Sequence, residues 1–152
     1  MPRIVHGIDE ITGLAGQDLG HSGWRPVTQE LIDAFAEVSG DHQWIHTDTG
    51  RAAAGPYGRT IAHGYMILSW GIPLFSELLE VRGVGMALNY GVNKVRFPAP
   101  VPVGSRVRLH ASVAAVEPVK RGGVQVTRSF TFELEDSAKP ACAAESLTHY
   151  YP

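Results

Sequence analysis

One long apolar segment, IAHGYMILSWGIPLFSELL at residues 61–79, constrains the fold more than any other part of this chain. Its length suits a helix, and its apolar residues do not alternate as they would in a half-buried strand. A helix that is apolar on nearly every side must be covered on most sides by other structure. Gly71 and Pro73 are expected to bend or split it, because proline removes one hydrogen bond within a helix.

The structure that covers this helix is expected to consist of strands, because the residue pattern after Gly83 is typical of extended chain. The segment GMALNYGVNKVRF is followed by the connector PAPVPVGS, and KRGG at residues 120–123 is typical of a hairpin turn. Two further segments alternate, and the residues expected on their buried faces are Val107, Leu109, Ala111 and Val113, then Val124, Val126, Phe130, Phe132 and Leu134. ACAAESLTHYY makes the last strand. A helix wrapped by a curved antiparallel meander is an α+β architecture.

A shorter amphipathic helix is expected ahead of the apolar segment. Thr28 is a suitable N-cap for TQELIDAFAEVSG, and Gly40 is placed to end this helix. The residues expected on its packed face are Leu31, Ile32, Phe35 and Val38. Residues 1–23, which are rich in glycine, are expected to form an irregular or partly extended lead-in. At 152 residues the chain is expected to be a single domain, residues 1–152.

The composition argues against several classes of function. Apolar residues make up 44% of the chain, charged residues 18%, and the net charge is −2, so nothing favours binding to a nucleic acid. No run of about 18 uncharged apolar residues is present to span a membrane, and no signal-peptide pattern is visible, so we expect a cytoplasmic protein. The single Cys142 excludes an internal disulfide and is expected to be an inert packing residue.

Residues suited to proton chemistry gather between residues 36 and 70. Asp41 comes directly after the predicted helix end, and His46 follows it in a turn-rich segment. A carboxylate and an imidazole that converge on one water molecule can remove or return a proton. A glycine-rich loop at residues 47–60 follows them. On local sequence alone, the alternative is that Asp41 caps a turn and that His46 packs in the core.

The wider pattern around these residues resembles a known family. The motifs that carry the resemblance are Ser39-Gly40-Asp41, Ile45-His46-x-Asp48, Ile61-Ala62-His63-Gly64 and Val95-Arg96-Phe97-x-x-Pro100-Val101-x-x-Gly104. In this order and spacing they resemble the MaoC-like dehydratases, the (R)-specific enoyl-thioester hydratases. Within that family the chain is most similar to the nodulation-protein-N-like single-domain subgroup. The resemblance covers residues 25–150.

This resemblance implies a hot-dog fold, in which an antiparallel sheet wraps a central helix, and a homodimer with active sites near the subunit interface. It also implies reversible hydration of a trans-2-enoyl thioester of coenzyme A or an acyl carrier protein, without a metal or redox cofactor. The resemblance further implies that Asp41 and His46 are catalytic residues. Many relatives carry Asn-Pro where this chain has Gln43 and Trp44. Gln43 can make the same amide hydrogen bonds. The bulk of Trp44 is expected to affect which acyl chains the site accepts.

Gly64 is the third expected catalytic position. If the central helix begins there, its free backbone N–H groups face the thioester oxygen, and such a donor lowers a barrier by ~3 kcal/mol. The alternative is an ordinary glycine at a helix start. A metal site at His42 and His46 is not expected, because an i, i+4 histidine pair needs a helix, and the helix has ended at Gly40.

Further residues are candidates for contact with the substrate: Gln43, Tyr57, Arg59, His63, Lys94 and Arg96. Tyr57 is expected to line the acyl pocket and Arg59 to meet a phosphate of coenzyme A. Lys94 and Arg96 could meet the pantetheine or the nucleotide phosphates. His63 is expected chiefly to orient the loop or to donate to a backbone carbonyl. Each of the others could instead be an ordinary exposed residue.

Two rival functions fit the same pattern. A hot-dog thioesterase would hydrolyse the same class of substrate, and a non-catalytic subunit would bind an acyl thioester without turnover. The spacing of Asp41 and His46, followed by Ala62-His63-Gly64, favours hydration. Analysis of the product separates these functions.

Overall fold

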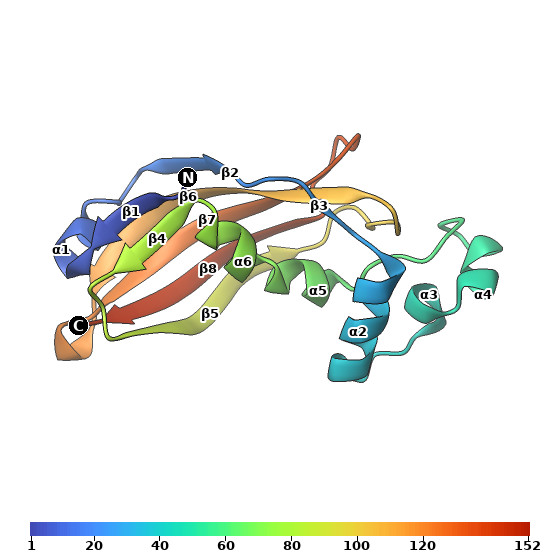
Figure 1. Ribbon diagram of the computed structural model, residues 1–152, viewed down its shortest axis with the longest axis horizontal. Coiled ribbons are helices and arrows are strands. Elements are labelled where there is room, and N and C mark those ends of the chain that lie inside the picture. Colours follow the sequence, from blue (N-terminus) through green and yellow to red (C-terminus); the bar gives the residue numbers. More distant parts are fainter.

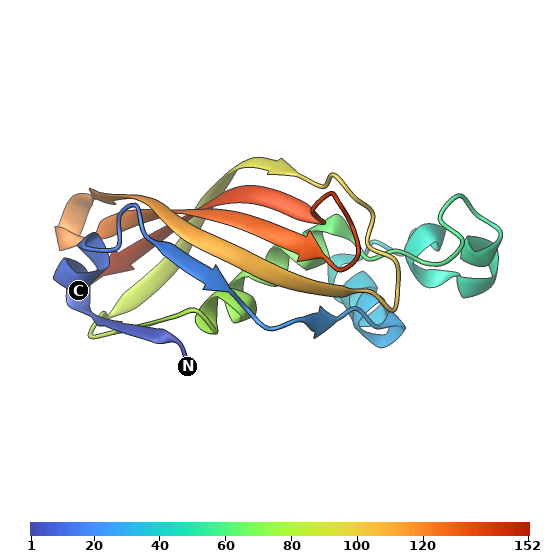
Figure 2. The same cartoon turned by 90° about the horizontal axis from the view of Figure 1, so that it is seen from above.

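A twisted antiparallel sheet, with two short helices lying against one of its faces, forms the centre of the molecule (Figure 1, and from above in Figure 2). The computed structural model describes all residues, 1–152. None of its helices combines the length and the hydropathy needed to cross a membrane. The elements are β1 (Arg3–His6), α1 (Gly7–Thr12), β2 (Asp18–His21), β3 (Arg25–Pro26), α2 (Gln29–Ser39), α3 (Trp44–Thr47), α4 (Thr49–Ala53), α5 (Gly64–Ser69), α6 (Gly71–Ser76), β4 (Leu79–Arg82), β5 (Met86–Arg96), β6 (Arg106–Pro118), a 3-10 turn (Lys120–Gly122), β7 (Val124–Leu134) and β8 (Cys142–Tyr151).

The six-stranded sheet runs in the order β2-β6-β7-β8-β5, with β3 also paired to β6. All of its pairings are antiparallel. The turn Lys120–Gly122 joins β6 to β7, as the KRGG pattern predicts. Strand β5 pairs only with β8, so its other side is an open edge of the sheet.

The alternating residues predicted for β6 and β7 face the core. On β6 these are Val107, Leu109, Ala111 and Val113, each at most 1% exposed. The buried residues of β7 include Val124, Val126, Phe130, Phe132 and Leu134. The remaining position on this face of β7 is occupied by Arg128, which is also buried.

The apolar segment 61–79 forms two helices, α5 and α6, in place of one continuous helix. Trp70 separates them, directly before Gly71, so the expected interruption is confirmed. The cover around these helices is less complete than the apolar sequence predicts. Tyr65 is 71% exposed and Ile72 is 49% exposed, because nothing in a single chain packs over them.

The lead-in is more regular than expected, since residues 1–23 contain β1, α1 and β2. Strand β1 pairs in parallel with β4, and β2 pairs with β6. Ile11 and Leu14 are buried in the core. The glycine-rich residues 1–23 therefore form regular strands because they pair with strands that lie far along the sequence.

Helix α2 begins and ends where the sequence predicts. Leu31 N–H donates to Thr28 Oγ1 at 3.2 Å, and Gly40 ends the helix with φ at 78°, a conformation that favours glycine. Ile32 is buried as expected. The expectation for Val38 was wrong: it is 84% exposed, because the last turn of α2 projects beyond the sheet (Figure 1).

The lone thiol of Cys142 lies on β8 with no exposed surface. Burial raises the pKa of this thiol to about 11. A thiol with that pKa stays protonated and unreactive at neutral pH. The expected packing role of Cys142 agrees with this environment.

Candidate active site

Asp41 and His46 face the start of α5 across a hollow of about 460 Å³. It forms where the end of α2, the helix α3 and the first turn of α5 meet near the end of β5 (Figure 1). Its lining residues are Phe35, Ser39, Asp41, His46, His63, Gly64, Tyr65 and Phe97. The fold therefore brings the three predicted catalytic residues to one place.

Asp41 is held by the backbone turn that follows α2. Its N–H donates to Ser39 Oγ at 3.2 Å, and its Oδ1 accepts from Gln43 N–H at 3.3 Å. Its Oδ2 lies 3.9 Å from His46 Nε2. That separation is too long for a direct hydrogen bond, and one water molecule can bridge such a gap.

His46 is a buried base with one ring nitrogen free. Its side chain is 8% exposed, whereas that of Asp41 is 53% exposed. His46 Nδ1 lies 2.7 Å from the carbonyl oxygen of Ile61, which can only accept, so Nδ1 carries the hydrogen. In the neutral ring, Nε2 therefore keeps its lone pair, and this nitrogen faces Asp41.

His63 stacks on His46, with ring centroids 3.8 Å apart and ring planes at 23°. Its Nε2–H donates to the backbone carbonyl of Asp41 at 2.9 Å, as expected for a histidine that supports a backbone segment. Burial is the main cause that lowers the pKa of His63, and the nearby His46 lowers it further. The buried His63 Nδ1 has no partner within the chain. A neutral His63 therefore offers one acceptor at the wall of the hollow.

Gly64 is the first residue of α5, so its backbone N–H has no acceptor within that helix. The ring of Phe97 packs directly against it. A Cβ added at Gly64 would lie 2.9 Å from Phe97 Cδ1, which is closer than real Cβ contacts. Only glycine leaves room for this ring. The backbone N–H of Gly64 lies at the wall of the hollow as an unsatisfied donor.

A second and mainly apolar hollow, of about 260 Å³, adjoins the first. The two hollows share His46, Gly64 and Phe97. The other lining residues of the second are Tyr57, Ile61, Ala62, Ile67, Ala99, Pro100, Val101 and Ala141. Tyr57 thus lies on the wall of a mainly apolar space that His46 also lines.

Four predicted substrate-binding residues line neither hollow: Gln43, Arg59, Lys94 and Arg96. Gln43 is exposed just before α3. Arg59 and Arg96 each donate to a backbone carbonyl. Lys94 is 83% exposed and lies 3.5 Å from Glu145. Contact between these residues and a substrate stays a prediction.

Sequence reasoning did not name four lining residues as parts of the site: Phe35, Ser39, Tyr65 and Phe97. Ser39 and Phe97 lie within the family motifs, and Phe35 lies on the packed face predicted for α2, so a signal was present for these three. Tyr65 lies in the long apolar segment, which predicts burial in the core. Its exposure becomes visible only in the folded chain.

Asp41, His46 and His63 also lie close enough together to hold a metal ion. One ligand atom from each lies within 4.8 Å of the others. This set does not include His42, which the sequence pairs with His46. In the structure His42 Nε2 lies 3.5 Å from Glu37 Oε1. His63 Nε2 is already bonded to a carbonyl, which leaves only its Nδ1 as a ligand atom. Chelation experiments separate metal binding from proton transfer at this cluster.

Comparison with known proteins gives the cluster its context. The family model for the MaoC-like domain matches residues 10–133. A 3-hydroxyacyl-thioester dehydratase Z from Mycobacterium tuberculosis is 53% identical over 148 residues, which covers 97% of this chain and 98% of the relative. Nodulation protein N from Rhizobium leguminosarum bv. viciae is 39% identical over 141 residues, or 91% of this chain and 88% of the relative.

A solved structure extends the comparison to the fold. The monoamine oxidase regulatory protein from Archaeoglobus fulgidus superposes with a TM-score of 0.79 and covers 100% of this chain and 99% of its own. The two sequences are 24% identical, so this likeness bears on the fold alone. The expected hot-dog architecture is confirmed.

Proposed function

This chain belongs to the MaoC-like dehydratase family, and on that premise we propose that Asp41 and His46 are its catalytic pair. Its activity is that of a hydro-lyase, which dehydrates a 3-hydroxyacyl thioester and, in reverse, hydrates a trans-2-enoyl thioester to the (R)-3-hydroxyacyl product. The observation that carries the residue assignment is the 3.9 Å gap between Asp41 Oδ2 and His46 Nε2. One water molecule fits between two acceptors at this distance.

Hydration requires the water oxygen to bond to C3 while a proton is added to C2. His46 Nε2 has the lone pair that takes one proton of the water, and Asp41 Oδ2 accepts the hydrogen bond of the other O–H. As the new C3–O bond forms, the electrons of the double bond move toward the thioester carbonyl. Return of the proton from His46 to C2 completes the addition and restores both groups. Dehydration follows the same steps in reverse.

The negative charge that develops on the thioester oxygen needs a donor. We assign this role to the backbone N–H of Gly64, which has no acceptor inside α5 and lies in the wall of the same hollow. A preorganised donor of this kind lowers an acyl-transfer barrier by ~3 kcal/mol. Because Gly64 has no side chain, the oxygen can approach its nitrogen closely.

The second hollow is the proposed place for the acyl chain. It is mainly apolar, and it meets the first hollow at His46 and Gly64, so the reacting C2 and C3 atoms would lie at this junction. Tyr57 and Phe97 form part of its wall. The thioester carrier, coenzyme A or an acyl carrier protein, would then extend outward past the exposed side of the first hollow.

We propose that two copies pair through the open edge of β5. The large apolar residues that this strand exposes are Met86, Leu88, Tyr90 and Val92, at 45% to 64% exposure. An unpaired edge with apolar side chains is a liability for a monomer, and pairing with a second copy would cover it. The proposed compartment is the cytoplasm, supported by a single buried cysteine and no disulfide.

The test is to mix purified protein with a short trans-2-enoyl-coenzyme A and to follow the absorbance of the conjugated enoyl group. Hydration removes this absorbance without releasing a thiol and yields the (R)-3-hydroxyacyl thioester. Appearance of free thiol would instead identify a thioesterase. Binding without turnover over several chain lengths, for coenzyme A and carrier-protein substrates alike, would leave an acyl-thioester-binding subunit.

A further inference from the structure

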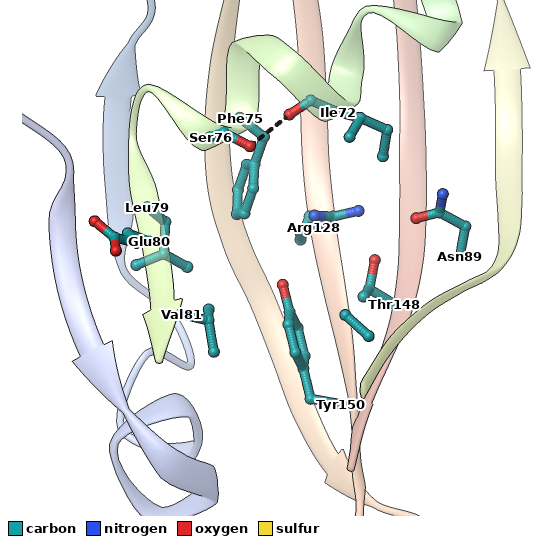
Figure 3. Close-up of a pocket in the computed structure, with 11 residues that line it drawn as sticks. Ile72, Phe75, Ser76, Leu79, Glu80, Val81, Asn89, Arg128, Thr148 and Tyr150 are labelled. Atoms are coloured by element: carbon teal, nitrogen blue, oxygen red, sulfur yellow. Dashed lines mark hydrogen bonds between the residues drawn. The ribbon is translucent and has the colours of Figure 1, made fainter. Parts of the chain in front are cut away.

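A third cavity, apart from the two hollows of the candidate active site, contains a buried arginine that has no carboxylate partner. It lies between α6, β4 and the strands β5, β7 and β8, and its volume is about 490 Å³ (Figure 3). None of its lining residues belongs to either hollow of the candidate active site. It is therefore a separate space with its own chemistry.

Arg128 is the residue that distinguishes this cavity. It occupies a core-facing position on β7 and is 3% exposed. Figure 3 shows its guanidinium extending from β7 into the cavity, toward the side where Asn89 lies. Burying a charged side chain is costly unless partners compensate it, so an arginine at this position calls for a physical reason.

The hydrogen-bonding capacity of Arg128 is largely unused. One Nη2–H donates to Ser146 Oγ at 2.7 Å, while its Nε and Thr148 Oγ1 are buried with no partner. Arg128 takes part in none of the ion pairs of the chain. The rings of Phe75 and Phe130 lie 4.4 and 4.9 Å from its guanidinium carbon. Such cation–π contacts compensate only part of the cost of burying a charge.

Glu80 lines the same cavity, but it is not the counter-ion of Arg128. Its carboxylate accepts from Arg82 Nε at 2.6 Å, and both of these side chains are exposed to solvent. In Figure 3 the Glu80 carboxylate points away from Arg128. Burial is the main cause that lowers the pKa of Arg128, and the neighbouring Tyr150 phenol offsets this lowering only in part. One positive charge inside the cavity is left without compensation.

We propose that this cavity binds a monocarboxylate with a short apolar body. The planar guanidinium of Arg128 presents paired N–H donors that match the two oxygens of a carboxylate, and Thr148 supplies a hydroxyl beside it. Ile72, Phe75 and Val81 provide an apolar wall for the body of the ligand.

The charge and the size of the cavity select this class of ligand. A carboxylate carries the single negative charge that Arg128 balances, whereas the second charge of a phosphate would have no cationic partner among the lining residues. The volume of about 490 Å³ lies within the usual range of small-molecule sites, roughly 300–1,000 Å³. The proposal does not depend on the hydratase mechanism, because the two sites share no residue.

The probe is hexanoate, and its matched control is hexanamide, which has nearly the same size but no charge. In titration calorimetry with the intact protein, we expect saturable binding of hexanoate and at least about tenfold weaker binding of hexanamide. Arg128→Gln is expected to weaken hexanoate binding by about tenfold or more, and Thr148→Val by a few-fold. Arg121→Gln, which alters an exposed arginine in the turn Lys120–Gly122, is expected to change nothing.

Equal affinity for hexanoate and hexanamide would overturn the proposal, as would an unchanged affinity in Arg128→Gln. Tighter binding of inorganic phosphate than of hexanoate, lost in Arg128→Gln, would replace the monocarboxylate with a phosphate ligand. Circular dichroism checks that each variant is folded. If Arg128→Gln does not fold, the comparison of hexanoate with hexanamide, on the unaltered protein and on Thr148→Val, still decides the question.

Discussion

His63 lies flat against the ring of His46 while its Nε2–H donates to the backbone carbonyl of Asp41 at 2.9 Å. One buried ring therefore contacts both members of the proposed catalytic pair. It holds the peptide that carries Asp41, and it packs on the face of the base. Because His63 directly precedes α5, it also ties that pair to the helix whose first residue, Gly64, is the proposed oxyanion donor.

The burial of His63 predicts a pH dependence of stability. In the folded protein the pKa of His63 is lowered from its ordinary value of 6.5, chiefly by burial. The unfolded chain therefore binds this proton at a higher pH than the folded protein does, and the free energy of unfolding falls as the pH drops below about 6.5. His63→Gln, which cannot titrate, should show a shallower fall between pH of about 7.5 and about 5.5 in urea unfolding.

The matched control for this measurement is His6→Gln, because His6 is an exposed histidine far from the cluster in sequence. It should keep the slope of the unaltered protein. If His63→Gln and the unaltered protein lose stability equally over this pH range, the buried ring is not the source of the effect.

Removing either proton-transfer group should abolish most of the hydratase activity. We expect Asp41→Asn and His46→Gln to lower kcat/KM by about 10²–10⁴-fold, the usual contribution of general acid–base catalysis. Asp41→Asn should unfold at nearly the same urea concentration as the unaltered protein, because the Asp41 side chain is 53% exposed. Glu37→Gln removes a carboxylate of α2, 78% exposed, and should keep full activity. Normal turnover in Asp41→Asn would remove Asp41 from the mechanism.

A methyl group at Gly64 should disturb the site through Phe97. Because the added Cβ would lie 2.9 Å from the Phe97 ring, we expect Gly64→Ala to push this ring into the hollows and to lower kcat/KM by about tenfold. The double variant Gly64→Ala with Phe97→Ala should recover part of the loss. Gly50→Ala is the control, since its Cβ would meet only Asp48 Oδ1 at 3.7 Å. No loss in Gly64→Ala would show that the ring turns aside freely.

Metal removal should leave the activity unchanged. Proton transfer by His46 and Asp41 needs no metal, although these residues and His63 lie close enough to hold one. Protein dialysed against EDTA, with its metal content checked by mass spectrometry, should hydrate the enoyl thioester at the rate of untreated protein. Loss of activity that Zn²⁺ or another divalent cation restores would assign a metal to the cluster.

A charge on the open edge of β5 should separate the proposed dimer. Leu88 is 45% exposed on this strand, and Leu88→Lys would place a desolvated ammonium in the interface. We expect the unaltered protein to sediment as a dimer and Leu88→Lys to shift toward the monomer. Ile4→Lys, which alters an exposed residue of β1, should stay dimeric. A monomeric unaltered protein would contradict the proposal directly.

Prediction from sequence succeeded where near neighbours along the chain decide the outcome. Thr28 caps α2 because its hydroxyl reaches a backbone N–H three residues away. Gly40 ends that helix because glycine tolerates a positive φ. For the site, Asp41, His46 and Gly64 came from ordered motifs, and the fold places all three around one hollow. Prediction failed for Val38, because the extent of the core around a helix turn is not a local property.

The sequence by itself determined the main strands, the ends of α2 and the family, since capping, alternation and motif spacing act over a few residues. Only the tertiary structure decided which side chains meet. The stack of His63 on His46 joins the start of α5 to α3, and the charge of Arg128 lies in a cavity that four strands and a helix enclose. Such contacts form between residues distant in sequence, whose approach depends on how the sheet and the helices pack together.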